Sequence, residues 1–297
     1  MTAATAVIGA LALAGCGGGT TGGTETGGAD AGTGDPGSTS LTIGIANEQP
    51  YGYMGDDGEA TGFDPEITRQ VLVNLGYSEE NLEFRVVEFG QLIGGLQAGQ
   101  FDLVAAGMYI NPERLEQVLF TDPDYCTYEG LAVAEGNPED IADYQSFTEN
   151  PDLTIAVATG TVEEGYAKDA GIPAEQIESF PGIDQMYEAL AAGEVDAVTG
   201  TAATVNTHVA ATEGIEAVEP FFPEDAEGNE TLPCGGIAFA QDDGAFRDEF
   251  NEELNTLRED GTTTEIITSY EDQDGNPYFT EQDVETANEL TVDDFRG

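Results

Sequence analysis

Short apolar runs alternate with amphipathic stretches along most of the chain, and this alternation predicts an α/β fold. In residues 41–46 large apolar side chains recur at every second position, as in a strand, whereas in residues 63–75 they recur three and four positions apart, as in a helix. We expect Asp64 and Pro65 to cap and to start this helix. The elements expected in this first unit are strands over 41–46, 84–89 and 101–106 and helices over 63–75 and 91–98. Their β-α-β-α-β order is typical of a parallel sheet covered by helices.

A second unit of the same kind follows the apolar strand at 131–134 and the turn signal Asn137-Pro138. Its expected strands cover 154–158, 177–180 and 196–198, and its expected helices cover 162–170, 183–192 and 202–211. A late strand at 237–240 and helices over 243–260 and 263–270 return to the first unit, and the acidic tail should hold one short helix near 281–290. Two units joined by two crossovers predict two lobes, with a ligand site in the cleft between them.

The composition narrows the choice of ligand. The chain of 297 residues has 59 Asp and Glu against seven Lys and Arg, a formal net charge of −52. Such a surface repels nucleic acid and anionic lipid headgroups, and it argues against a ligand of net negative charge. At ~1 M salt the Debye length is about 3 Å, so high salt removes most of the repulsion within the chain. The composition therefore predicts a protein that works in high salt and binds a zwitterion or a cation.

The amino terminus resembles the signal of a bacterial-type lipoprotein. An apolar run over 3–14 leads into Leu13-Ala14-Gly15-Cys16, which is similar to a lipobox. The run is too short for an ordinary transmembrane helix, so we expect a signal over 1–16 and a lipid on Cys16 that holds the chain on the outer face of the cytoplasmic membrane. No Lys or Arg precedes the run, a departure that fits a start upstream of Met1. Residues 17–40, rich in Gly and Thr, predict a flexible tether.

Two further cysteines, Cys126 and Cys234, are a possible disulfide pair in an oxidising compartment. Both precede similar segments, Gly130-Leu-Ala-Val-Ala and Gly236-Ile-Ala-Phe-Ala. Two small buried thiols fit the sequence at least as well, and spacing does not decide between the two.

One of the scarce cations, Arg114, follows the strand expected at 101–106, after the turn signals Gly107 and Asn111-Pro112. Open α/β sheets bind ligands beyond the carboxyl ends of their strands, so Arg114, with Tyr109 nearby, is a candidate seat for a carboxylate. Taken alone, this Arg fits better as a surface residue paired with an acid.

A set of ordered motifs changes that balance. They resemble the polar-amino-acid-type solute-binding proteins of ABC importers, over about residues 41–270. The motifs are Glu48-Gln-Pro-Tyr-Gly-Tyr53, Gly62-Phe-Asp-Pro-Glu-Ile67, Phe101-Asp-Leu103, Asn111-Pro-Glu-Arg114, Phe120-Thr-Asp-Pro123 and Gly193-Glu-Val-Asp-Ala-Val198. The resemblance implies a type II periplasmic-binding-protein fold, α/β, with lobe 1 over 41–125, lobe 2 over 126–235, and a return to lobe 1 with the tail over 236–297. It also implies that Arg114 grips the ligand's carboxylate, and that a monomer delivers a small solute to a membrane permease.

Departures from that family point to a narrower group. Amino-acid binders usually hold the α-ammonium with an Asp five residues after the position of Asp196, where this chain has Thr201, and they favour small hydroxyl residues where it has Tyr109. Segments 46–53, 88–90, 105–110 and 160–168 instead resemble ectoine- and hydroxyectoine-binding proteins. That resemblance implies that Glu48 pairs with the ring amidinium of the ligand and Arg114 with its carboxylate. It further implies that Tyr51, Phe89 and Tyr109 enclose the ligand's ring. Thr161 and Thr201 would close over the ligand from lobe 2.

Several alternatives remain open. The ligand could be a polar or cationic amino acid, and each aromatic or acidic site residue could be an ordinary core or surface residue. Thr161 and Thr201 could be helix N-caps. An enzyme, such as a dehydratase on this fold, is less favoured because the chain has one His, His208, and no catalytic motif that we recognise. A sensory domain is also less favoured, since no apolar stretch that could span a membrane follows. No cofactor or metal is expected, because Pro277 stands where a calcium loop beginning at Asp272 would need Gly.

Overall fold

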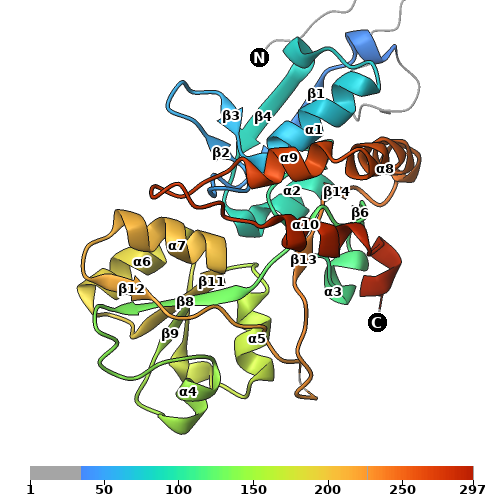
Figure 1. The fold of residues 1–297 in the computed structure, drawn as a ribbon. Coiled ribbons are helices and arrows are strands. Elements are labelled where there is room, and N and C mark those ends of the chain that lie inside the picture. The colour runs from blue at the N-terminus through green and yellow to red at the C-terminus, as the bar shows by residue number, and fades with distance from the viewer. Residues whose placement is uncertain (1–34, 226, 297) are drawn as a thin grey trace, which may run out of the picture.

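Two five-stranded sheets, each with helices packed against it, form the body of the protein (Figure 1). The computed structural model describes residues 35–225 and 227–296. The first sheet has the strand order β4-β1-β5-β14-β6 and consists of β1 (Leu41–Ile45), β4 (Leu82–Val86), β5 (Leu103–Val104), β6 (Leu119–Phe120) and β14 (Ala238–Phe239). The second has the order β10-β9-β11-β8-β12 and consists of β8 (Glu129–Ala134), β9 (Ile155–Ala158), β10 (Ile177–Phe180), β11 (Ala197–Thr201) and β12 (Ile215–Ala217). The predicted α/β fold is confirmed.

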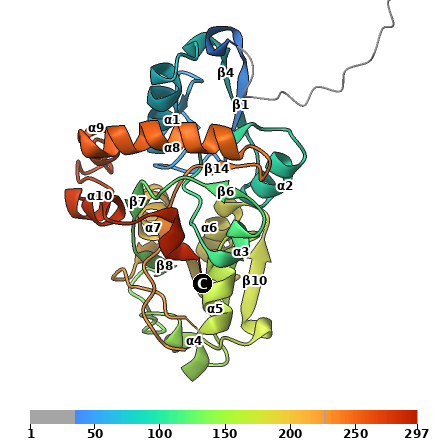
Figure 2. The same ribbon diagram turned by 90° about the vertical axis from the view of Figure 1, so that its right-hand side faces the viewer.

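The first sheet is mixed: β1 pairs with both β4 and β5 in parallel, and β14 pairs with β5 and β6 in antiparallel fashion. One face packs against α1 (Phe63–Asn74), α8 (Gly244–Glu259) and α9 (Thr262–Thr268), and α8 lies beside α1 (Figure 2). The other face packs against α2 (Leu92–Gln97). The alternation in 41–46 arises because every second side chain of a strand points to the same face of the sheet. Leu41, Ile43 and Ile45 share one face of β1, and all three are fully buried.

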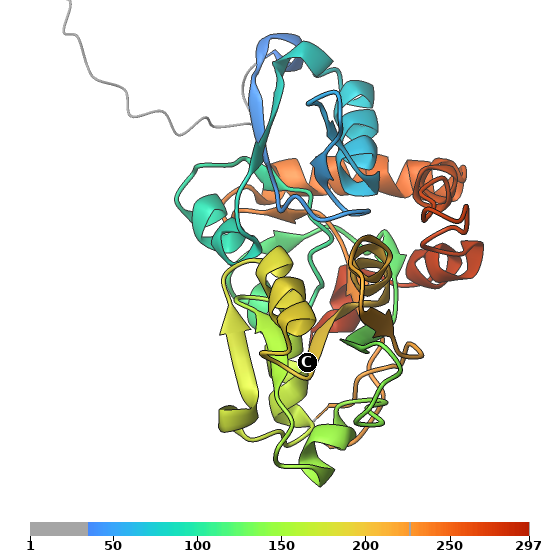
Figure 3. The ribbon, with the colours of Figure 1, turned by 90° about the vertical axis from the view of Figure 1, so that its left-hand side faces the viewer.

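The second sheet is covered on both faces in the same way. Helices α6 (Ile183–Ala192) and α7 (Ala202–Ala211) lie on one face (Figure 3), and α4 (Gln145–Glu149) and α5 (Glu163–Asp169) lie on the other. The predicted helices over 183–192 and 202–211 match α6 and α7 residue for residue. Helix α7 begins directly after β11, two residues separate α6 from β10, and both helices carry apolar side chains that pack against the sheet.

Two short strands connect the sheets. Strand β7 (Tyr125–Cys126) pairs in antiparallel fashion with β13 (Cys234–Gly235), and Cys126 lies opposite Cys234. The two cysteines form a disulfide, with 4.0 Å between their Cα atoms. The disulfide therefore joins the two segments through which the chain passes from one sheet to the other and back.

The predicted cap of the helix at 63–75 is wrong, although the helix does begin at Phe63. Gly62, at φ 109°, is the N-cap of α1, so Asp64 lies inside the first turn. The Asp64 carboxylate is buried there and accepts a hydrogen bond of 2.5 Å from the backbone N–H of Gly107. Asp64 thus supports the turn that leads to Arg114 and does not cap its own helix.

Three further boundaries differ from the prediction. The strand predicted over 84–89 is β4, which ends at Val86, and Phe89 instead starts the 3-10 turn Phe89–Gln91 before α2. The strand predicted over 101–106 is regular only in β5. Of the predicted tether, residues 35–40 are described, and Pro36–Ser38 form a 3-10 turn. The predicted lipobox and Cys16 lie outside the described residues.

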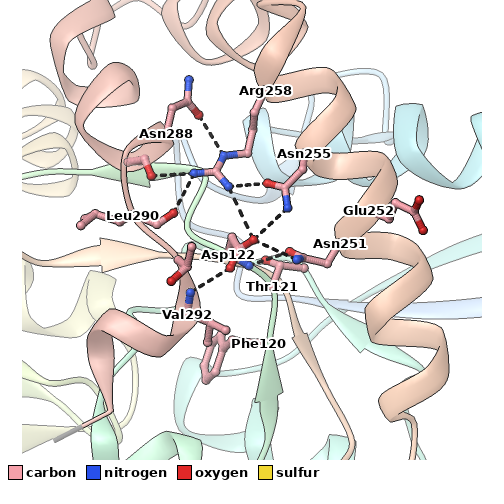
Figure 4. Close-up of polar contacts among 12 residues, drawn as sticks. Phe120, Thr121, Asp122, Asn251, Glu252, Asn255, Arg258, Asn288, Leu290 and Val292 are labelled. Carbon is pink, nitrogen blue, oxygen red and sulfur yellow. Dashed lines mark hydrogen bonds and ion pairs between the residues drawn. The ribbon is translucent and has the colours of Figure 1, made fainter.

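The acidic tail packs against β7 and β13, here called the hinge strands (Figure 1). Its helix α10 (Glu281–Asn288) contacts β7, and Ala287 packs with the two disulfide cysteines. The buried Arg258 of α8 donates hydrogen bonds to the side chain of Asn288 and to the carbonyls of Ala287 and Leu290 (Figure 4). The tail is thereby tied to the helix that covers the first sheet.

Asp122 joins the same network (Figure 4). It accepts hydrogen bonds from the Asn251 and Asn255 side chains and from the Val292 backbone N–H, and its carboxylate lies 3.8 Å from the Arg258 guanidinium. Burial alone would raise the pKa of Asp122, but the hydrogen bonds and Arg258 lower it below its usual value. The charged form of Asp122 is thus stabilised where the tail meets the hinge.

Across 35–225 and 227–296, no helix is long and apolar enough to cross a membrane.

Candidate ligand-binding site

Arg114 is held in place by its own short helix. After β5 the chain turns at Gly107 and enters α3 (Pro112–Leu115), whose N-cap Asn111 accepts a hydrogen bond of 2.8 Å from the backbone N–H of Arg114. Sequence reasoning did not find this helix, although Asn-Pro is a regular cap and N1 pair. Arg114 is 5% exposed, so its guanidinium is fixed at the end of the strand and not free in solvent.

The guanidinium of Arg114 bridges the two halves of the molecule. Its Nη1 donates to the carbonyl of Tyr109 at 2.8 Å, and its Nη2 donates to the carbonyl of Gly160, beyond β9 of the second sheet, at 3.1 Å. The Phe89 ring centre lies 5.4 Å from the guanidinium carbon. Burial lowers the pKa of Arg114, but an Arg remains charged in proteins. A buried cation with a planar fork of donors can bind the two oxygens of a carboxylate.

All seven residues predicted to bind the ligand line one cavity between the two sheets. They are Glu48, Tyr51, Phe89, Tyr109, Arg114, Thr161 and Thr201, joined by Gly107, Val162 and Glu163. The cavity volume is about 30 Å³, far below the roughly 300–1,000 Å³ of common ligand pockets. A groove of about 600 Å³ adjoins it and shares Phe89, Arg114, Thr161 and Val162. A solute the size of an amino acid does not fit in this cavity, so contacts between the lobes must break before it can bind.

Those contacts form a chain of hydroxyl groups. Tyr51 donates to Thr201 Oγ1 at 2.7 Å, Thr201 donates to Thr204 Oγ1 at 3.0 Å, and Thr204 donates to Glu48 Oε1 at 2.6 Å. Tyr51 and Glu48 come from the first half of the molecule, and both threonines come from the start of α7. Thr201 also accepts from the Thr204 backbone N–H, so it caps α7 and lines the cavity at once. Thr161 is not a cap: its hydroxyl donates to the carbonyl of Ala158.

Burial shapes the charge of the cavity. It raises the pKa of Glu48 to about 7, although the Thr204 hydroxyl opposes this and Glu163 adds to it. Burial also raises the pKa of Glu129 and of Glu163, and the three carboxyl groups repel one another. One guanidinium thus shares the cavity with two carboxyl groups, Glu48 and Glu163, and Glu129 is buried nearby. This arrangement fits a ligand that brings a positive group together with its carboxylate, because a nearby positive group favours the charged form of a buried carboxyl group.

Sequence reasoning missed Glu129 and Glu163. Glu163 belongs to a segment, 160–168, that the narrower resemblance used without giving this residue a role. Glu129 pairs in register with Thr201 across β8 and β11, which places it at the cleft end of the sheet. It is fully buried beside the Tyr109 hydroxyl, and its carboxylate oxygens have no regular hydrogen bond among the described residues. A strand that starts with Glu in an otherwise apolar run was the available signal.

Two glycines allow the halves to meet. A Cβ on Gly90 would lie 2.6 Å from the carbonyl oxygen of Thr159, and a Cβ on Gly160 would lie 2.7 Å from the Cα of Gly90. Gly160 has φ +86°, which also disfavours other residues, whereas Gly90 has no such restriction. A substitution at Gly90 therefore tests only the close approach of the two lobes and not a backbone conformation that requires Gly.

We expect Gly90→Ala to weaken solute binding about tenfold or more without lowering the melting temperature, because the added methyl group holds the lobes apart. Isothermal titration calorimetry measures the affinity, and small-angle scattering measures the ligand-dependent compaction, which should shrink in the variant. Gly94→Ala is the matched control, since a Cβ there meets no atom within 4 Å. Normal affinity and compaction in Gly90→Ala would contradict the closing role of this contact.

No metal centre is evident within 35–225 and 227–296, where no group of three His, Cys, Asp or Glu side chains could hold an ion. The carboxylate of Asp272 instead accepts hydrogen bonds from the backbone N–H groups of Asp274 and Asn276 within its own turn. His208, the single histidine of the chain, stacks on Tyr187 at 4.0 Å between ring centres and does not line the cavity around Arg114.

Comparisons with known proteins agree with this arrangement. The sequence profile of the bacterial extracellular solute-binding proteins, family 3, matches residues 41–273. A probable amino-acid ABC transporter periplasmic-binding protein of Sinorhizobium fredii, y4tE, is 33% identical over 77% of this chain and 76% of its own length. A crystal structure of EhuB in complex with hydroxyectoine is 30% identical, with a TM-score of 0.75 over 86% of this chain and 94% of EhuB.

A structure of an ancestral arginine-binding protein bound to arginine is 26% identical, with a TM-score of 0.66 over 78% of this chain and 97% of that protein. Such relatives serve ABC importers outside the cytoplasm, so a small solute and a membrane permease are the partners that membership entails. The chain belongs to family 3 of the bacterial extracellular solute-binding proteins.

Proposed function

We propose that the protein binds ectoine or hydroxyectoine in the cavity around Arg114 and presents it to the permease of an ABC importer. Ectoine is a cyclic zwitterion with a carboxylate and a delocalised amidinium cation. The observation that carries the proposal is that one small cavity holds both a basic and an acidic side chain. Arg114 is the partner for the ligand's carboxylate, and Glu48 is the partner for its amidinium. A ligand without net charge also avoids repulsion by a chain of net charge −52.

The aromatic residues support the same ligand. Tyr51, Phe89 and Tyr109 line the cavity between Glu48 and Arg114. The faces of aromatic rings attract a diffuse cation by about 0.5–2 kcal/mol per ring. Tyr51 is backed by Phe63, Tyr125 and Phe279, with ring centres 5.4, 5.4 and 5.9 Å away, so its position is set before the ligand arrives. Preorganised rings cost little entropy on binding.

A cationic amino acid is the second candidate, and the buried Glu129 and Glu163 favour it. With Glu48 and Glu163 in the cavity lining and Glu129 buried nearby, carboxyl groups outnumber the single guanidinium of the lining. A ligand such as arginine would bring two positive groups and one carboxylate. The position of Thr201, where amino-acid binders usually have an Asp for the α-ammonium, argues against it. We propose binding and not catalysis for either ligand.

Titration calorimetry in molar KCl tests the proposal with a panel of ectoine, hydroxyectoine, glycine betaine, proline, arginine and glutamine. We expect ectoine or hydroxyectoine to bind at least about tenfold more tightly than any other member, because only they combine a ring amidinium with a carboxylate. Binding of arginine or glutamine with no binding of either ectoine would overturn the assignment and leave the family intact.

The predicted location and habitat remain part of this proposal. We propose that a lipid on Cys16 holds the protein, as a monomer, on the outer face of the cytoplasmic membrane. We also propose that it works in high salt, because at low ionic strength the acidic side chains of a chain with net charge −52 strongly repel one another. A compatible solute such as ectoine is useful to a cell in such a habitat, which links the charge of the protein to its ligand.

A further inference from the structure

Glu163 carries an unused hydrogen-bond acceptor in the cavity. The residue is 6% exposed, lines the cavity, and has an Oε2 atom with no partner among the described residues. Burial raises the pKa of Glu163, and Thr161 and the backbone N–H groups of Val162 and Glu163 offset only part of that rise. A buried acceptor without a donor is costly, and a ligand that supplies the donor recovers that cost.

The location of Glu163 indicates which ligand atom it meets. Its carboxylate interacts electrostatically with the Arg114 guanidinium, and both residues line the same cavity. If Arg114 holds the ligand's carboxylate, the atoms next to that carboxylate lie nearest to Glu163. In hydroxyectoine a hydroxyl group occupies the ring carbon adjacent to the carbon that bears the carboxylate, and in ectoine this position carries only hydrogen.

We propose that Glu163 accepts a hydrogen bond from a ligand hydroxyl adjacent to the carboxylate and so makes the cleft prefer a hydroxylated solute over its unhydroxylated parent. This inference rests on the proposed function and adds the residue that separates the two ectoines. A site that hydrogen-bonds a ligand hydroxyl discriminates against the analogue that lacks it, because the site's own polar atom then stays unpaired.

The test compares ectoine and hydroxyectoine by calorimetry in the same molar KCl buffer. We expect the wild type to bind hydroxyectoine about 10- to 100-fold more tightly, the range that corresponds to leaving one buried polar atom unpaired. Glu163→Met, which keeps the chain length and removes both oxygens, should bring this ratio to within about threefold of one. The loss should fall mainly on hydroxyectoine. Glu163→Ala serves as a second variant if the Met side chain disturbs folding.

Glu164→Met is the matched control. Glu164 is the next residue of α5, forms an ion pair with Lys168 at 2.7 Å, and faces the outer groove and not the small cavity. It should leave the ratio unchanged. If the wild type binds both solutes equally, or if both Glu163 variants keep the wild-type ratio, the role of Glu163 is wrong while the proposed function stands. If neither solute binds the wild type, the proposed function itself fails.

Discussion

Replacing Arg114 with Ala should abolish detectable solute binding. Arg114 is the cation among the ten residues that line the cavity, and it is 5% exposed. Without it, the ligand's carboxylate would be buried beside Glu48 and Glu163 with no positive partner. Removing one member of a buried, hydrogen-bonded charge pair costs about 2–5 kcal/mol or more, which is about 30-fold to several thousand-fold in affinity.

Calorimetric titration with whichever solute the wild type binds measures this effect. Arg85→Ala is the matched control, because Arg85 pairs with Glu83 at the surface, at 2.8 Å, and is half exposed. The control should bind as the wild type does. Arg114 also donates to two backbone carbonyls, so a thermal melt must show that the variant still folds. Arg114→Ala with a normal melt and normal affinity would show that the carboxylate site lies elsewhere.

The regular elements of the fold could be predicted because local pattern and burial coincide in them. Helices α6 and α7 are each separated from the preceding strand by two residues at most and pack apolar side chains against the sheet, so their bounds matched. The N-cap of α1 could not be predicted in this way. Asp64 looks like a cap in the sequence, but the N–H of Gly107, 43 residues later, takes its carboxylate. A contact between distant segments overrode a local preference.

The site shows the same division. Motif resemblance brought seven residues together, and the structure places all of them around one cavity. It did not assign Glu163 or Thr204, whose roles depend on contacts that only the folded cleft creates. The pairing of the cysteines was open for the same reason, since 108 positions separate them and only the meeting of β7 and β13 makes them neighbours.

Loss of the disulfide should have the largest effect on stability. The cysteines close a loop of 108 residues that contains the whole second sheet. In the chain-entropy view such a cross-link destabilises the unfolded state, and removal of a native disulfide costs about 2–5 kcal/mol. The folded hinge should suffer as well, because Cys126 and Cys234 are buried against Ala287 of α10. The double variant Cys126→Ala/Cys234→Ala should therefore lower the free energy of unfolding by about that amount.

Urea is the denaturant for this measurement, at a fixed molar KCl concentration. Guanidinium chloride is itself a salt and would screen a net charge of −52 while it unfolds the chain, so its midpoint would mix two effects. A reducing agent should lower the urea midpoint of the wild type towards that of the double variant and leave the double variant unchanged. An unchanged wild-type midpoint, with both thiols shown to be free, would mean that pairing of β7 with β13 and the packed tail hold the hinge without the covalent bond.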